Sequence, residues 1–470
     1  MKKRLLALLL TMTMGLTACS GAADTSAAGD SASGSAAGAS TAGTSAASTT
    51  SPQSAAAPEA DNIDLSAYKV TEPVTIQFWH QYTSEKRAAW IDKVTEEFNN
   101  SQDLVTVESS YFGSYDVIAE AVAASIAAGG EGLPAVVTIN TPRVINYWQS
   151  GIVEPLDNYM AVNEVNMDDY LASALDAYTM DDQLWGLPFG TSAGCIIYNK
   201  TVCDENDLPF PQTWDEFRSW CKNIYEKTGM TAFAFVNDFN YMNNFFINVT
   251  GKDPLGDGTV SLLKDPEFKA FVQDVKELCD AGYCVMWNTG DDQKAAFGAK
   301  TLAAYTYTTN DIVKAQQLAE ENGFEISTQL GVTGTDKAPI STVSGASLVT
   351  FSMLDQNVKA AAAEYMAYLT NSDNNFEWVI DTQMLPSHYS VIQSDELQAL
   401  YEKYPGYEPV FEQAADIISK NKSPMMQSCM EAVVGVVYAY VNGDITEADF
   451  DNQWKNMVTE VDNMLYDSAN

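Results

Sequence analysis

The fold is decided by one short stretch, Val74-Thr75-Ile76-Gln77-Phe78-Trp79, which continues into His80-Gln81-Tyr82. Its β-branched and aromatic residues predict a strand, and Thr83 or Ser84 can cap a helix directly after it. A strand that runs straight into a helix is typical of an α/β fold. We therefore expect the aromatic and polar residues at the end of this strand to lie at one edge of a sheet.

Two more expected strands follow the same pattern, at residues 105–107 and 135–139. The first ends close to Tyr111 and the second ends at Asn140. The helices expected after the first and the second strand of the chain carry apolar residues on one face, as crossover helices on a parallel sheet do. Because ligands usually bind at the carboxyl ends of the strands in an open α/β sheet, we predict a binding site at this edge.

The length and the charge of the chain limit its class. The 470 residues, less a leader and a spacer, leave about 400 for folding, which is enough for two lobes. A formal net charge of −38 argues against nucleic acid or an anionic membrane surface as a partner, because like charges repel at long range. The same charge also fits simple solubility outside a cell.

The amino terminus predicts export and lipid attachment. A basic start, Met1-Lys2-Lys3-Arg4, precedes an apolar run that is too short to cross a bilayer. Leu16-Thr17-Ala18-Cys19 then resembles a bacterial lipobox, which makes residues 1–19 a signal peptide and Cys19 the lipidated residue. An ordinary secretory leader is the alternative. Residues 20–61, rich in Ser, Ala, Gly and Thr, predict a disordered tether, so we expect an extracytoplasmic protein anchored by lipid to the bacterial cell membrane.

Histidine and cysteine content leaves little room for a metal centre or a cofactor. The chain has only two histidines, His80 and His388, and no cysteine pair has the close spacing of a zinc site. Beyond Cys19, six cysteines remain, which could form three disulfides or stay as buried free thiols. The sequence therefore predicts no metal ion and no cofactor, and it leaves the state of the thiols open.

Residues 184–200 predict a segment that crosses between lobes, because glycine and proline punctuate small hydroxyl residues there before an apolar strand. Thr213-Trp214-Asp215-Glu216 then has the pattern of a capping box, in which a hydroxyl and a carboxylate satisfy free helix amides. Earlier in the chain, Thr141 is expected as an N-cap with Pro142 at the first helical position. Strands and capped helices thus alternate, as in an α/β protein.

Several short motifs follow one another in order from about residue 74 to the carboxyl end. They are Ile76-Gln77-Phe78-Trp79-His80, Gly151-Ile152-Val153-Glu154-Pro155-Leu156, Leu187-Pro188-Phe189, Tyr198-Asn199-Lys200, Thr213-Trp214-Asp215-Glu216, Phe297-Gly298-Ala299-Lys300, Ser344-Gly345-Ala346-Ser347 and Leu385-Pro386-Ser387. Each motif is weak alone. Their order and spacing, behind a lipobox and a tether, resemble those of the bacterial extracellular solute-binding proteins, family 1, which serve ABC importers and include maltose- and glycerol-phosphate-binding proteins.

The resemblance implies a periplasmic-binding-protein-like α/β fold, with two α/β lobes joined by hinge strands and a ligand cleft between them. It places the first lobe at residues 62–186 and 328–386, and the second at residues 187–327 and 387–470. It also implies a monomer that closes on a small-molecule solute and docks on the membrane subunits of an ABC permease.

The resemblance further carries ligand-binding positions of the glycerol-phosphate-binding branch to matching residues of this chain. These residues are Tyr111, Asn140, Thr191, Ser192, Tyr307, Ser344 and Gly345. Asn140 replaces an acidic residue of that branch, Met384 replaces an aromatic residue, and no arginine stands near Met425-Met426. Because a phosphate ester favours a bidentate guanidinium, a carbohydrate of one or more sugar units fits better than glycerol phosphate or its diesters, which are the alternative.

A sugar presents an apolar face to an aromatic ring, and the chain has many aromatic candidates for that contact. They are Trp79, Tyr82, Tyr111, Tyr115, Trp148, Phe189, Phe239, Tyr241, Trp287, Tyr305 and Tyr307. We expect Trp79, Tyr111 and Tyr307 to contact the ligand and most of the others to pack in the core. His80 and His388 stand in matching motifs and are expected either at the ligand or as structural histidines.

A surface glycosidase is the alternative from a different class, because two carboxylates can hydrolyse a glycosidic bond. Adjacent carboxylates such as Asp168-Asp169 arise easily among 63 acidic residues, and neighbouring side chains point apart. We therefore predict no catalytic residues and no enzyme activity, but a cycle in which open lobes capture a solute and close on it.

Overall fold

Among the described residues, nine strands form one mixed sheet in the order β2-β1-β3-β11-β6-β9-β7-β8, with β10 paired to β6. The computed structural model describes residues 64–470, except residues 254, 257, 289, 335–340, 412–416, 419–421 and 470. The predicted signal peptide with Cys19 and the predicted tether at residues 20–61 lie outside the described residues. The strands of the sheet are β1 (Val74–His80), β2 (Val105–Tyr111), β3 (Val136–Asn140), β6 (Leu187–Asn199), β7 (Thr231–Val236), β8 (Cys284–Trp287), β9 (Leu302–Thr308), β10 (Ile326–Gln329) and β11 (Val343–Val349).

The first three strands run parallel, as the alternation of strand and helix predicts. Helix α1 (Glu85–Ser101) connects β1 to β2, and helix α2 (Tyr115–Ala127) connects β2 to β3. The apolar spacing of α1 places Ile91, Val94 and Phe98 on its buried face. Both helices are therefore crossover connections, as predicted.

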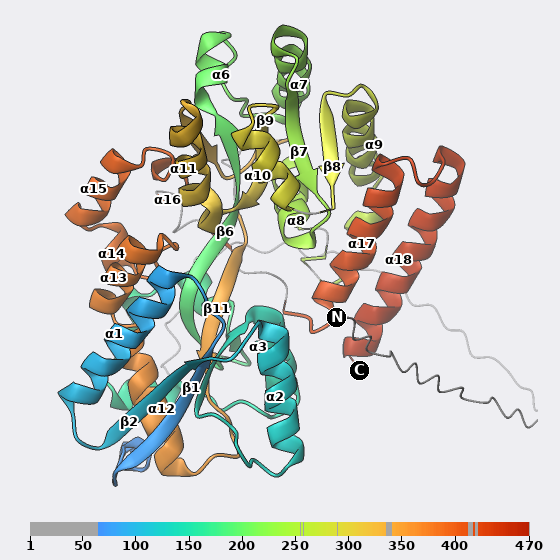
Figure 1. The fold of residues 1–470 in the computed structure, drawn as a ribbon. Helices are drawn as coiled ribbons and strands as arrows, with labels where there is room; N and C mark the ends of the chain where they lie inside the picture. Colours follow the sequence, from blue (N-terminus) through green and yellow to red (C-terminus); the bar gives the residue numbers. More distant parts are fainter. Residues whose placement is uncertain are drawn as a thin grey trace, which may run out of the picture. The chain divides into compact units, whose positions relative to one another are not determined.

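Strand β6 joins two groups of strands. Its first half pairs antiparallel with β11 from Leu187 to Ala193, and its second half pairs antiparallel with β9 from Gly194 to Tyr198. Every residue of β6 except Tyr198 is buried. Figure 1 shows β6 running from the group that contains β1, β2 and β11 to the group that contains β7, β8 and β9. This strand lies within the segment expected at residues 184–200 and joins the two groups of strands; that it crosses between lobes stays a prediction.

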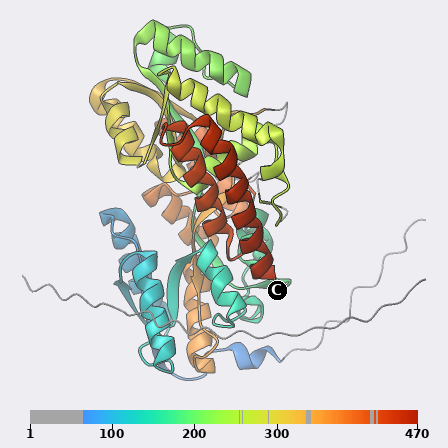
Figure 2. The same cartoon turned by 90° about the vertical axis from the view of Figure 1, so that its right-hand side faces the viewer.

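Helices cover both groups of strands. The remaining helices are α3 (Thr141–Gln149), α4 (Asp157–Val162), α5 (Ala172–Asp176), α6 (Lys200–Glu205), α7 (Trp214–Thr228), α8 (Phe239–Thr250), α9 (Pro266–Asp280), α10 (Gly290–Gly298), α11 (Ile312–Asn322), α12 (Gln356–Leu369), α13 (Ser372–Thr382), α14 (Tyr389–Ile392), α15 (Asp395–Lys403), α16 (Glu408–Phe411), α17 (Met426–Val441) and α18 (Glu447–Ala469). The last two helices lie side by side (Figure 2). A small hairpin, β4 (Thr179–Met180) with β5 (Gln183–Leu184), stands apart from the main sheet.

Two helix starts test the predicted caps. At the start of α7, the Thr213 hydroxyl accepts a hydrogen bond from the Glu216 N–H, and the Glu216 carboxylate accepts one from the Thr213 N–H. The capping box is therefore confirmed. The predicted N-cap at Thr141 is wrong, because α3 already includes Thr141 and its N-cap is Asn140. Asn140 Oδ1 accepts from Arg143 Nη1 at 2.9 Å and makes no side-chain bond to a helix amide.

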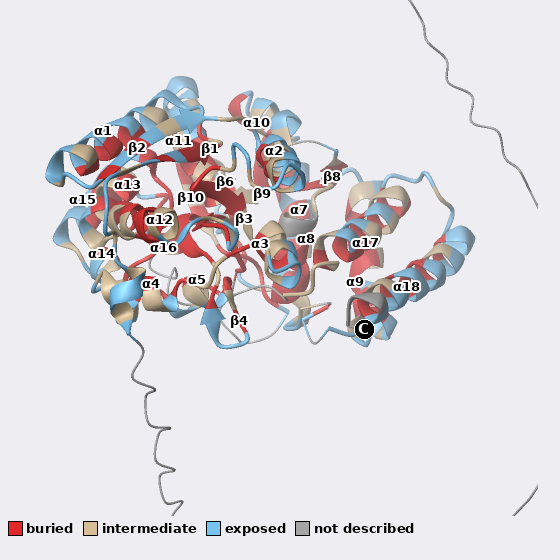
Figure 3. Ribbon diagram, turned by 90° about the horizontal axis from the view of Figure 1, so that it is seen from below, coloured by how far each residue is buried: buried red, intermediate tan, exposed pale blue. Residues whose placement is uncertain are grey.

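The buried side chains form two hydrophobic cores. Figure 3 colours the buried residues red, and they lie along the strands and on parts of the helices that cover them. The larger core contains Trp378 and the smaller contains Phe246, and burying a side chain of this size contributes about 1.5–3 kcal/mol. Ile312, Leu397 and Tyr407, from segments assigned to the second lobe, belong to the larger core. The cores thus do not follow the predicted lobe boundaries, which stay a prediction.

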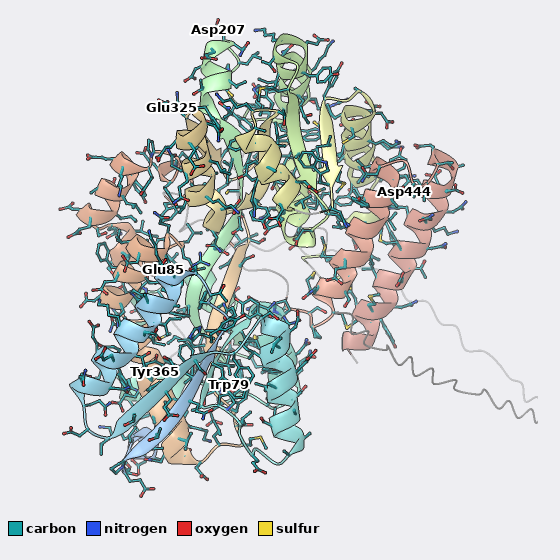
Figure 4. The ribbon with its side chains drawn as sticks, viewed as in Figure 1. Trp79, Glu85, Asp207, Glu325, Tyr365 and Asp444 are labelled. Atoms are coloured by element: carbon teal, nitrogen blue, oxygen red, sulfur yellow. The ribbon has the colours of Figure 1, made fainter. Side chains whose placement is uncertain are left out.

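The acidic side chains contribute a solvated surface. Glu85 at the start of α1 and Asp207, Glu325 and Asp444 in connections between elements are all exposed on the outside of the protein (Figure 4). Within the part of the chain that the structure describes, no helix combines the length and the apolar character needed to cross a membrane. The negative charge of these residues lies in water rather than in a buried cluster.

The six cysteines of the folded part are free thiols, and all of them except Cys279 are fully buried. Burial raises the pKa of Cys203 to about 12 and the pKa of Cys429 to about 11. Of the two possibilities that the sequence leaves open, the structure therefore shows free thiols rather than disulfides.

Candidate functional site

A cavity of about 310 Å³ lies where the two groups of strands meet along β6. Its volume is at the lower end of the range of about 300–1,000 Å³ that is common for small-molecule sites. The polar and aromatic side chains that line it are Tyr115, Asn140, Thr141, Ser192, Tyr241, Asn244, Thr308, Asn310, Ser344, Ser423 and Gln427. They come from the ends of β3 and β9, the middle of β6, the first residues of α2, α3, β11 and α17, and from α8, except that Asn310 lies in the short helical turn after β9 and Ser423 lies just before α17.

Four predicted ligand-binding residues line this cavity: Asn140, Ser192, Ser344 and Gly345. Strand β11 brings them together, because it pairs with β3 on one side and with β6 on the other. In this register Ser344 lies opposite Ser192, and a bulge follows Gly345. The sheet thus gathers at one place residues that are far apart in the sequence.

Trp79 and Tyr111, two predicted aromatic contacts, lie elsewhere. Trp79 is buried at the end of β1 and stacks on Phe112, with ring centroids 3.7 Å apart. Tyr111 ends the edge strand β2 and is 56% exposed. Neither residue lines the cavity, so a contact of either one with the solute stays a prediction.

Thr191 and Tyr307 lie close behind the cavity wall without lining it. Thr191 is buried in β6 beside Ser192, and its carbonyl oxygen accepts a hydrogen bond from the Leu385 N–H at 2.9 Å. Tyr307 stacks on Tyr241, with ring centroids 4.8 Å apart, and Tyr241 faces the cavity. Tyr307 therefore supports a ring of the cavity wall, and its direct contact with a solute stays a prediction.

Both histidines are buried outside the cavity. His80 Nδ1 accepts a hydrogen bond from the Tyr82 N–H at 3.3 Å, and the His388 ring lies 3.9 Å from the ring of Tyr170. Burial lowers the pKa of each histidine to about 4, so both are neutral at physiological pH. This arrangement fits the structural alternative for the two histidines.

Sequence patterns missed the amide groups of the cavity. Asn244 Oδ1 accepts hydrogen bonds from the N–H and the hydroxyl of Thr342, at 3.0 and 2.8 Å, which fixes the amide beside Gly194. Asn310 Oδ1 is buried and accepts no hydrogen bond from any described residue. One signal was present in the sequence, because Asn243 and Asn244 interrupt an otherwise apolar helix. The structure shows that both side chains are buried.

The family model for bacterial extracellular solute-binding proteins matches residues 89–408. The chain belongs to this family. Its members bind solutes for transport and are not a family of enzymes. The sn-glycerol-3-phosphate-binding periplasmic protein UgpB of Yersinia pestis bv. Antiqua is 23% identical over 381 residues, which cover 77% of this chain and 83% of that protein.

Solved structures of solute-binding proteins share the fold. The cyclic α-maltosyl-1,6-maltose binding protein of Arthrobacter globiformis matches with a TM-score of 0.71 at 20% identity, over 84% of this chain and 99% of that one. UgpB of Mycobacterium tuberculosis, solved in complex with glycerophosphocholine, matches with a TM-score of 0.70 at 20% identity, over 85% and 100% of the two chains. The predicted periplasmic-binding-protein-like fold is therefore confirmed.

In this solute-binding protein, none of the described side chains that line the cavity carries a formal charge. The Arg143 guanidinium stands nearby on α3, but it pairs with the Asp116 carboxylate and with Asn140 Oδ1. Burial raises the pKa of Tyr115 and of Tyr241, so both phenols stay protonated and can donate hydrogen bonds. The cavity thus offers neutral donors and acceptors beside two rings.

A charged pair stiffens the wall behind Tyr241. Lys294 Nζ lies 4.4 Å from the centre of the Tyr307 ring and 3.4 Å from the Asp311 carboxylate. Burial alone would lower the pKa of Lys294, but the neighbouring Asp311 and Tyr307 raise it, so the ammonium stays charged. This charge holds the Tyr307 ring on which Tyr241 stacks.

Proposed function

We propose that the protein captures a neutral carbohydrate of one or more sugar units outside the cell and delivers it to the membrane permease of an ABC importer. The neutral lining of the cavity carries this proposal, since amides, hydroxyls and two tyrosines surround the site without a charge. Sugar hydroxyls both donate and accept hydrogen bonds, as amides do. An aromatic ring adds about 0.5–1.5 kcal/mol beyond its buried area.

The polar side chains that line the cavity come from both groups of strands, and this supports binding by closure. Asn140 and Ser344 belong to the group of strands around β11, whereas Asn244 and Asn310 belong to the group around β9. A solute that contacts both groups stabilises the closed arrangement by the difference between its affinities for the closed and open forms. We place the lobes at residues 62–186 with 328–386 and at residues 187–327 with 387–470.

The proposal includes a lipid anchor. Cys19, in a lipobox-like sequence, would carry the lipid, and residues 20–61 would tether the folded part to the membrane. Each buried methylene contributes about 0.8 kcal/mol to such an anchor, so more than one acyl chain holds it stably. The anchor would keep the protein close to the permease. We propose that it works there as a monomer.

A second candidate solute is a glycerol phosphodiester. The start of α3 opens into the cavity through Thr141 and Pro142, and helix amino termini attract anions. The names of the two UgpB proteins connect them with sn-glycerol-3-phosphate and glycerophosphocholine. The neutral solute remains favoured, because Asp116 already neutralises the Arg143 guanidinium.

Calorimetric titration of the full chain separates the two candidates. We expect binding of a mono- or oligosaccharide that is insensitive to added salt, whereas a phosphodiester would bind more weakly as salt rises. Tyr241→Ala should lower the sugar affinity by up to about tenfold, because it removes an aromatic contact. Tyr225→Ala is the matched control, since Tyr225 is exposed on α7 and does not line the cavity.

Two results would contradict the carbohydrate proposal. One is binding of glycerophosphocholine without binding of any sugar in a panel of glucose, galactose, mannose and xylose and their oligomers. The other is equal sugar affinity for the wild type and for Tyr241→Ala, which would show that the sugar does not bind in this cavity.

A further inference from the structure

Gln81 lies behind the cavity wall, in the connection that follows β1. This strand runs parallel to β3, with Trp79 opposite Val137, which brings the residues after β1 close to Thr138. The Thr138 hydroxyl donates a hydrogen bond to Gln81 Oε1, and Gln81 Nε2 donates one to the phenol oxygen of Tyr115 at 2.9 Å. Gln81 does not line the cavity, whereas Tyr115 does. The amide therefore connects a buried strand to a side chain of the site.

This chain of hydrogen bonds runs in one direction. Thr138 is fully buried in the sheet, and its hydroxyl hydrogen is used on the Gln81 oxygen. That bond turns the amide nitrogen of Gln81 towards Tyr115, and an amide N–H can only donate. The phenol oxygen of Tyr115 accepts on this side, and none of the described residues accepts the phenol hydrogen. The hydrogen is therefore left for a solute in the cavity.

Two asparagines of the cavity have their side-chain oxygen occupied in the same way. Asn140 Oδ1 accepts from Arg143 Nη1 at 2.9 Å, and Asn244 Oδ1 accepts from both the N–H and the hydroxyl of Thr342. Each asparagine thus keeps its Nδ2 hydrogens for other partners. In these two residues and in Tyr115, a donor of the protein occupies an acceptor atom and leaves a donor at the cavity.

On the basis of the proposed function, we infer that Gln81 is a positioning residue that fixes Tyr115 as a hydrogen-bond donor to the solute. The sugar oxygen that faces Tyr115 is then recognised as an acceptor. A group that can only donate, such as the ammonium of an amino sugar, is disfavoured at this position, because two donors would face each other without a hydrogen bond. Gln81 thus sets which groups of a sugar the site accepts without touching the sugar itself.

The test compares Gln81→Glu and Gln81→Met with the wild type by calorimetric titration of the full chain. The probe is the tightest binder among glucose, galactose, mannose, xylose and their oligomers, or glycerophosphocholine if no sugar binds. At pH 8 the carboxylate introduced by Gln81→Glu can only accept, so the Tyr115 hydrogen turns away from the solute. We expect a loss of affinity of about three- to tenfold. Gln81→Met should lose less than about threefold, because it leaves the phenol free to turn towards the solute.

A pH profile separates this role from a general loss of structure. Lowering the pH from 8 to 5 begins to protonate the introduced carboxyl, whose O–H can donate to the Tyr115 oxygen as the amide does. Gln81→Glu should therefore regain part of its lost affinity, whereas the affinity of the wild type should change little. The side chains that interact electrostatically with the Tyr115 phenol are those of Tyr82, Tyr178, Arg87 and Arg143. Burial raises the pKa of both tyrosines and arginines stay protonated, so these groups keep their charge between pH 5 and 8.

The matched control is Gln77→Glu, which adds the same charge to β1. Gln77 is exposed, does not line the cavity, and accepts a hydrogen bond from the Trp79 indole N–H at 3.3 Å, which a carboxylate also accepts. This variant should bind the probe as the wild type does at both pH values.

Two results would overturn the inference and leave the carbohydrate proposal intact. One is equal affinity of Gln81→Glu and the wild type at pH 8, which would show that Tyr115 does not donate to the solute. The other is a loss of affinity that is the same at pH 5 and pH 8, which would leave Gln81 a structural role only. Binding of glycerophosphocholine alone, with the expected loss and recovery in Gln81→Glu, would overturn the carbohydrate proposal and support the role of Gln81. Binding of neither kind of probe would overturn both.

Discussion

Replacing Gly345 with alanine should destabilise the protein strongly, because the new methyl group has no room. Gly345 has a φ of +123°, which side chains other than glycine rarely adopt, and its Cβ would lie 2.2 Å from the Gly190 carbonyl oxygen. Backbone strain of this kind costs about 1–3 kcal/mol. Forcing β6 and β11 apart adds an overpacking cost of about 1–3 kcal/mol. We therefore expect a loss of about 2–6 kcal/mol, measured by urea unfolding followed by circular dichroism.

The same substitution at Gly435 is the control. Gly435 is exposed in the middle of α17, and no atom lies within 4 Å of the position of an added Cβ. Alanine has the higher helix propensity, so Gly435→Ala should stabilise the protein by about 0.5–1 kcal/mol. If Gly345→Ala unfolds at the urea concentration of the wild type or above it, the close approach of β11 to β6 is not the constraint described here.

Three further outcomes are expected. Lowering the pH from 6.5 to 4 should reduce stability, because buried His80 and His388 have a pKa of about 4 when folded, whereas the unfolded chain takes up these protons near pH 6.5. Each histidine contributes at most about 1.4 kcal/mol per pH unit, so urea midpoints of His388→Gln should fall less steeply with pH than those of the wild type. Thr213→Ala should cost about 1 kcal/mol in thermal unfolding through loss of the α7 cap, and an unchanged melting temperature would show that the cap bonds are not stabilising. Asn244→Ala should cost about 1–3 kcal/mol for each group of Thr342 left without a partner and should weaken sugar binding; equal stability in urea would refute the role of these bonds.

Local patterns in the sequence were enough to predict the elements that begin the fold. The spacing of Ile91, Val94 and Phe98 defines a buried helical face because only one face of α1 meets the sheet. The capping box at Thr213 was equally local, since both partners lie within one turn. The predicted start of α3 was one residue late, because Thr141 followed by Pro142 has the sequence pattern of an N-cap. In the structure Asn140 is the N-cap, and its side chain accepts a hydrogen bond from Arg143 instead of from a helix amide.

The candidate site was predicted only in part, because local sequence patterns do not determine the order of the strands in the sheet. Tyr111 and Asn140 both end parallel strands, but β2 is at the edge of the sheet and β3 pairs with the central β11. Only Asn140 therefore reaches the cavity. Asn244 and Gln427 lie on helices α8 and α17, which are far apart in the sequence. Their positions at the cavity depend on tertiary packing, which local sequence patterns do not predict.

The buried thiols have a practical consequence for measuring solute binding. The thiolate is the reactive form of cysteine, and burial raises the pKa of thiols such as Cys203 and Cys429. The described cysteines should therefore react slowly with maleimide dyes without being replaced. A single cysteine introduced at exposed Asn146, on the helix α3 whose first residues line the cavity, would then carry a fluorophore selectively. Such a labelled protein would signal occupancy of the cavity for any compound added, before the identity of the natural solute is known.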